Sequence, residues 1–97
     1  MSAFARVYAR AVAGIPVAMT FDPNRKWFDL EWLPDRTIVQ PTEIFVPQLQ
    51  YPRGFNVSVS KGFAWTFNKQ TSVVYVALKP NSIRVSDSAF ARIRPAR

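Results

Sequence analysis

TEIFVPQLQYPRGFNVSVSKGFAWTF, residues 42–67, alternates between runs of strand-forming residues and short turns. The first run, 42–46, is rich in β-branched and aromatic residues, and Pro47 ends it because proline has no N–H to donate to a β-ladder. The segment YPRG at 51–54 predicts a type I turn, with proline at the second position and glycine at the fourth. This stretch therefore predicts a strand, an excursion and a turn back into the sheet.

Two further strands follow in the same stretch, and the flanking sequence repeats the pattern. In residues 55–59 and 63–67 every second side chain is large and apolar, which is the period of a half-buried strand. Strands are also expected at 15–21, 27–33, 72–78 and 89–94, with weaker signals at 6–13 and 83–85. Seven or eight short strands predict an all-β fold, an antiparallel two-sheet β-sandwich that is immunoglobulin-like in form. A small closed barrel is the alternative.

Composition limits the chain to one modest domain. It has 97 residues, of which 48% are hydrophobic and 20% charged, which predicts a single globular domain over 1–97 with Met1–Ala5 as a loose terminus. Cysteine and histidine are both absent, so a disulfide framework and a zinc site of the usual kind are excluded, and no cofactor is expected. No apolar run reaches the length that spans a bilayer.

The acidic residues do not predict a catalytic site. A glycosidase needs two carboxyl groups about 5–9.5 Å apart, and Asp29 and Glu31, two apart in one strand, would lie about 7 Å apart. A general acid also needs a raised pKa and hence burial, whereas these two alternate with Phe28, Leu30 and Trp32 and are expected to face water. Without histidine the usual nucleophilic triad cannot form. We therefore expect no catalysis from this chain alone.

The segments TEIFVP (42–47) and YPRGF (51–55), preceded by YARAVAGIP (8–16), resemble the C-terminal β-sandwich domain of endoglycoceramidase-type enzymes of glycoside hydrolase family 5. The family often has a proline where this chain has Ala9. The resemblance implies a non-catalytic accessory domain that packs against a catalytic (β/α)₈ barrel of the same or a partner chain, where the catalytic glutamates lie. It also implies a parent enzyme that cleaves glycosphingolipids or related glucosides, and a domain that braces the barrel and helps to contact a glycolipid substrate.

The run SVVYVAL at 72–78 is apolar on both faces. One face of such a strand is expected to enter the core of the sandwich. The other, represented by Val74 and Val76, is expected either to lie under a loop or to dock on the barrel. Tyr51 and Arg53, in the excursion between two strands, are further candidates for this docking surface.

A tryptophan is the first candidate for a ligand surface. Trp27 shares a strand face with Asp29 and Glu31, and its ring is expected to be exposed, where it would stack on a sugar or dock on a protein. Trp32 and Trp65 alternate with polar residues in their strands and are expected in the core.

Basic residues offer a second ligand surface. Arg92 and Arg94 share a face of the last expected strand, and such a pair either binds a phosphate, sulfate or carboxylate or is simply solvated. The net charge of +7 also suits nucleic acid, and KGFAW (61–65) resembles the start of an RNA-binding strand, but Thr66 and Asn68 then depart from that pattern. A single-stranded nucleic-acid-binding barrel is therefore the third hypothesis, after the accessory domain and an autonomous carbohydrate- or glycolipid-binding module.

Overall fold

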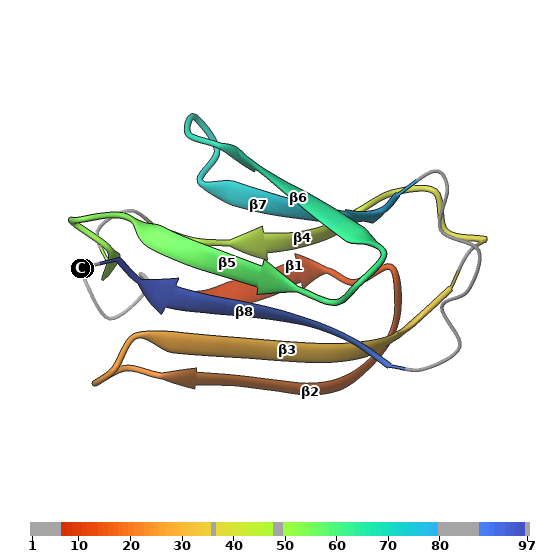
Figure 1. Cartoon of the computed structure of the whole chain (residues 1–97), viewed down its shortest axis with the longest axis horizontal. Helices are drawn as coiled ribbons and strands as arrows, with labels where there is room; N and C mark the ends of the chain where they lie inside the picture. The colour runs from red at the N-terminus through yellow and green to blue at the C-terminus, as the bar shows by residue number, and fades with distance from the viewer. Residues whose placement is uncertain (1–6, 36, 48–49, 80–87, 97) are drawn as a thin grey trace.

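A computed structural model describes residues 7–35, 37–47, 50–79 and 88–96, and they form a two-sheet antiparallel β-sandwich (Figure 1). One sheet has the order β1-β4-β7-β6 and the other the order β2-β3-β8-β5. The sandwich expected from the alternating pattern is confirmed. The strands are β1 (Tyr8–Ala11), β2 (Gly14–Asp22), β3 (Trp27–Pro34), β4 (Thr42–Phe45), β5 (Phe55–Val59), β6 (Phe63–Asn68), β7 (Val73–Leu78) and β8 (Ala89–Pro95).

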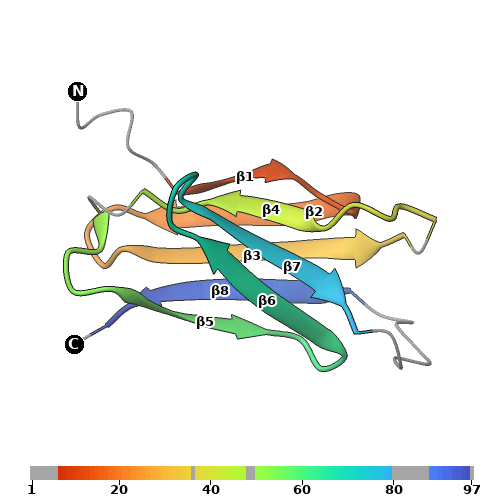
Figure 2. The same ribbon diagram turned by 90° about the horizontal axis from the view of Figure 1, so that it is seen from above.

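The core lies between the two sheets, which face each other in Figure 2. In β3 the predicted apolar face is confirmed, because Phe28, Leu30 and Trp32 are all buried. Their cross-strand partners on β8 are small or branched, since Leu30 pairs with Ala91 and Phe28 with Ile93. Trp32 meets Phe63 of the opposite sheet edge-to-face, with ring centroids 5.6 Å apart, so one aromatic contact joins the two layers.

The expectation that Val74 and Val76 form a docking surface was wrong. Both are in the core, with exposed fractions of 0% and 1%. The reason is that β7 lies between β4 and β6, and its alternation points these two valines inward, with Val74 paired with Ile44 and Val76 with Thr42. The opposite set faces outward, but its first member, Val73, is also fully buried.

Edge strands account for two further differences from expectation. The apolar residues of β2 were expected to be half-buried, but residues 15–20 are all exposed, because β2 is an edge strand with a register shift between Pro16 and Ala18. Trp65, expected in the core, is 40% exposed because β6 is the edge strand of the other sheet. The expected loose terminus at Met1–Ala5 and the expected strand at 83–85 lie outside the described residues.

Two hairpin turns have the same construction. The carboxylate oxygen Oδ1 of Asp22 accepts hydrogen bonds from the backbone N–H groups of Asn24 and Arg25, and these bonds lower the pKa of Asp22. In the β6–β7 turn, Oδ1 of Asn68 likewise accepts from the N–H groups two and three residues later. Each turn ends on a residue with left-handed backbone, Lys26 at φ 60° and Ser72 at φ 59°.

Candidate functional site

Three connections meet at one end of the sandwich, as Figures 1 and 2 both show: the β2–β3 turn, the turn at 51–54 and the β6–β7 turn. The hydroxyl of Tyr51 donates a 2.8 Å hydrogen bond to the carbonyl of Lys26, which fixes the first two connections to each other. The N–H of Gly54 donates to the carbonyl of Tyr51 at 2.9 Å, as in the predicted turn. Gly54 has the left-handed φ of 89°. Arg53 is exposed in this turn.

Tyr51 is thus a structural residue rather than a surface one. It is 3% exposed. Burial raises the pKa of Tyr51 to about 12 from the ordinary value of 10.0, and the charge of Arg94 acts in the opposite direction. The expectation that its ring faces a docking partner was wrong, because the ring fills the end of the core and packs on Phe55 at 5.6 Å.

The raised pKa of Tyr51 predicts that stability falls at high pH. Below pH 10 the phenol is protonated in both the folded and the unfolded chain, but between pH 10 and about 12 only the unfolded chain releases the proton. The loss due to Tyr51 is about 2 kcal/mol over this window. Tyr51→Phe should remove that loss while costing about 1 kcal/mol at neutral pH for the missing hydrogen bond. Urea unfolding of both proteins across the window measures the difference; parallel pH profiles would contradict it.

Trp27, the predicted ligand ring, is 39% exposed but is already in contact with two cations. The guanidinium carbon of Arg25 lies 4.8 Å from the ring centroid and that of Arg94 lies 4.7 Å from it. These are cation–π distances. Because two guanidinium groups already lie against the indole ring, the ring is poorly placed to stack on a sugar.

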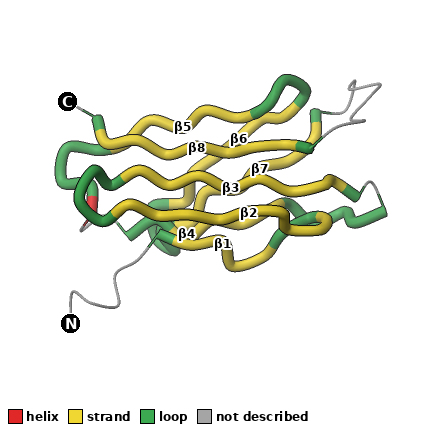
Figure 3. The backbone as a smooth tube through the Cα atoms, turned by 90° about the horizontal axis from the view of Figure 1, so that it is seen from below, coloured by secondary structure: helices red, strands yellow, loops and turns green. Residues whose placement is uncertain are grey.

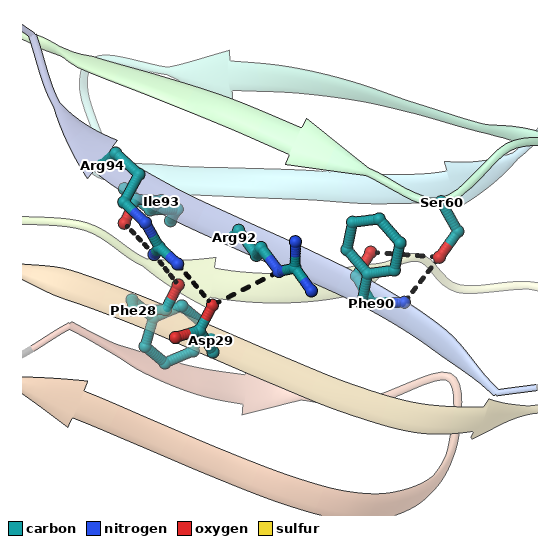
Figure 4. A network of polar contacts seen from close by, with 7 residues as sticks. All are labelled: Phe28, Asp29, Ser60, Phe90, Arg92, Ile93 and Arg94. Atoms are coloured by element: carbon teal, nitrogen blue, oxygen red, sulfur yellow. Dashed lines mark hydrogen bonds and ion pairs between the residues drawn. The ribbon is translucent and has the colours of Figure 1, made fainter.

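Arg92 and Arg94 share the outer face of β8, as predicted, and both reach Asp29 on the neighbouring β3 (Figure 4). Arg94 donates to Oδ1 of Asp29 at 2.8 Å and to the carbonyls of Phe28 and Ile93 at 3.1 and 3.0 Å. Nε of Arg92 lies 3.6 Å from the same carboxylate oxygen. Arg94 is therefore used to join β3 to β8 at this face, and Asp29 is already paired with two arginines.

A groove opens at the same end of the molecule, with a volume of about 730 Å³. It lies between the edge strands β5 and β6, where Phe55 and Phe67 meet edge-to-face at 5.0 Å. Trp65 and Lys69 form part of its lining. We call this feature the aromatic groove; its lining residues are Tyr51, Pro52, Gly54, Phe55, Trp65, Phe67 and Lys69. The sequence did not indicate it, because the pattern of β6 is that of a strand with one buried face.

The second surface that sequence reasoning missed is an apolar edge, formed by Ile15, Val17 and Met19 of β2 with Leu33 of β3. These four side chains are between 45% and 65% exposed. Residues 14–21 contain no charged residue, so the open backbone edge of β2 carries none of the charges that usually protect such an edge. The signal for it was present in the sequence as an uncharged apolar run, but the run did not indicate which strand would be an edge.

The acidic side chains of the described residues are scattered or paired. Among them there is no group of three acidic, histidine or cysteine residues that could hold a metal ion. Asp29 and Glu31 line a shallow hollow of about 270 Å³, together with Arg92. No helix in the described part of the chain is long and apolar enough to cross a membrane.

Comparison with known proteins gives the family. The model of the glycoside hydrolase family 5 C-terminal domain matches residues 6–86. The chain belongs to this family. This glycoside hydrolase family 5 C-terminal domain is 44% identical over 57 residues to endoglycoceramidase I of Rhodococcus hoagii (strain 103S). The aligned region covers 59% of this chain and 11% of that protein.

Two solved proteins contain a domain with the same fold. Endo-glycoceramidase II from Rhodococcus sp., solved alone and as a ganglioside GM3 complex, matches 95% of this family 5 domain with a TM-score of 0.72 and 26% identity. Sterylglucosidase 1 of Cryptococcus neoformans shares the fold, with a TM-score of 0.71 and 17% identity over 93% of the chain. The domain spans only 19% and 13% of those chains. The family resemblance of its sequence motifs is thereby confirmed.

Proposed function

We propose that this chain is a non-catalytic accessory domain that braces the catalytic (β/α)₈ barrel of a glycoside hydrolase. Membership of the family supports an association with such an enzyme. The observation that carries the bracing role is the apolar edge. Pro16 and the register shift beside it hinder edge-to-edge pairing along part of β2, but they do not cover its exposed apolar side chains. Such a surface is unfavourable in water, so a covering partner stabilises it.

The barrel fits that partner better than a second copy of this chain does. Each copy has a net charge of +7, and two such chains repel each other. The relatives, by contrast, have four-fifths or more of their length outside the matching domain. We further propose that the whole enzyme acts on glycolipids, as the ganglioside complex of the similar endo-glycoceramidase II favours, and that this domain helps to contact them.

If the barrel covers the apolar edge, a charge introduced at that edge should lower the melting temperature, and one introduced elsewhere on the surface should not. In the barrel joined to this chain, Val17→Lys should lower the melting temperature by several degrees, because the new ammonium group would be buried against the barrel. Thr66→Lys adds the same charge to an exposed position of β6 and should change the melting temperature little. Differential scanning calorimetry measures both.

The same proteins can contradict the bracing role. Equal melting temperatures for Val17→Lys and Thr66→Lys would exclude the apolar edge as the covered surface. A barrel that keeps its melting temperature and turnover after removal of this chain would contradict the role itself, as would a genome in which no barrel is encoded with it.

A further inference from the structure

Positive charge gathers at the end of the sandwich where the aromatic groove opens. We call this the basic end, and its cations in the three connections are Arg25, Lys26, Arg53 and Lys69. Asp22 is the carboxylate in the same turns, and its Oδ1 already accepts two backbone hydrogen bonds. The strands β3, β5 and β7 all run from the basic end to the opposite end. Asp35, Lys61 and Lys79 follow those strands in the sequence, so the charge of the described residues there is more balanced.

An amphipathic ring shares the aromatic groove with one of these charges. Trp65 is 40% exposed in the aromatic groove, and Lys69 lies on the same wall. Indole rings that are half in contact with apolar atoms and half with water concentrate at membrane–water interfaces, and flanking lysines and arginines reach the headgroups from there. Several cations on adjacent turns further strengthen membrane binding, because they are attracted to anionic lipids.

We propose that the basic end docks on an anionic phospholipid surface, with Trp65 at the level of the headgroups and Arg53 and Lys69 against their negative groups. The proposal goes beyond the bracing role and uses a different surface. β2 and β5 are opposite edges of one sheet, as Figure 3 shows, so the groove beside β5 stays open when the apolar edge on β2 is covered.

A lipid surface fits these residues better than single-stranded nucleic acid does. Base stacking along a strand uses several exposed aromatic faces in succession. Here Phe55 and Phe67 pack edge-to-face on each other and are partly buried against the core. Trp65 is left as the exposed large ring of the groove, with Lys69 in the same lining, and one such ring suits a broad charged surface more than a series of bases.

Vesicle binding tests the proposal on the 97-residue chain. Vesicles of phosphatidylcholine with phosphatidylserine should bind the chain, and vesicles of phosphatidylcholine alone should not, with binding weakened by added salt. Arg53→Gln with Lys69→Gln should lower the partition coefficient by about 25-fold, since each lost cation is worth about fivefold. The matched control, Lys61→Gln with Lys79→Gln, removes the same charge from the opposite end and should lower it less than about twofold.

The position of Trp65 needs a second readout. The readout is made in a Trp27→Phe background, because Trp27 is also half-exposed and touches Arg25 of the basic end. In that background, brominated lipids should quench the fluorescence of the bound chain, and Trp65→Phe should remove most of that quenching while keeping an apolar ring in the groove. Circular dichroism of each variant checks that the fold is retained. Trp32 remains in the buried core and is not expected to contribute.

Each outcome decides for or against the proposal. Anionic-lipid binding that depends on Arg53 and Lys69, with quenching through Trp65, supports it. Absence of vesicle binding overturns it, and so does an equal loss in the control pair or quenching that survives Trp65→Phe. Retention on single-stranded DNA or on a neutral glycan, without binding to anionic vesicles, would assign the groove to that ligand instead.

Discussion

Gly14→Ala is expected to be the most damaging of the glycine substitutions in the described chain. A Cβ at this position would lie 1.9 Å from the carbonyl oxygen of Leu33 and 2.8 Å from its carbon, which are backbone atoms of the paired strand. The φ of 151° is also one that residues with side chains rarely adopt. The start of the β2–β3 pairing would have to separate, at a cost of about 4 kcal/mol in the free energy of unfolding.

Gly54→Ala is the matched control for that prediction. Its backbone is also left-handed, with a φ of 89°, but the nearest atom to a Cβ there is 3.9 Å away. Only the backbone strain remains, about 1–2 kcal/mol. Urea unfolding of the two variants separates the cost of the steric clash from the cost of backbone strain. Equal losses in the free energy of unfolding would show that the close approach at Gly14 is not what requires glycine.

The second large effect is expected from a charge in the core. Val74→Asp should leave the chain unfolded, because the carboxylate would be buried without a partner beside Ile44 of the adjacent strand, a cost of about 4 kcal/mol or more. In the 97-residue chain alone, where no barrel covers the apolar edge, Val17→Asp introduces the same group at an exposed position and should change the free energy of unfolding by less than about 1 kcal/mol. Circular dichroism and urea unfolding distinguish them. A folded Val74→Asp protein would overturn the inward orientation of Val74.

The comparison of these two valines shows what local pattern can and cannot predict. Alternation located β2 as a strand, because side chains two apart share a face whatever the strand's neighbours are. The segment of β7 was located by its run of strand-forming residues, which is apolar on both faces. Neither pattern could tell that β7 is central and β2 an edge, since that depends on pairings between distant segments. The same limit explains why Trp32 was correctly expected in the core and Trp65 was not: both alternate with polar residues, but β6 has a neighbour on one side only.

For the candidate surface, the sequence predicted which face the side chains share but not which side chains contact one another. The face shared by Arg92 and Arg94 followed from their spacing, and the exposure of Trp27 followed from its place among acidic residues. Their contacts with one another did not, because Asp29 and Arg94 are 65 residues apart and meet only through the β3–β8 register. Arg25 contacts Trp27 across the β2–β3 turn, whose geometry the residue types at 22–25 only partly specify.

The position of β8 has a consequence for synthesis of the protein on the ribosome. Every strand that β8 joins is translated before it, and β3 and β5 have no partner on their facing sides until Ala89–Pro95 has emerged. Until then Phe28 and Leu30 lack their β8 neighbours Ile93 and Ala91, and the unfinished sheet is open to chaperones and proteases. Folding of this sheet can be completed only after β8 has left the exit tunnel.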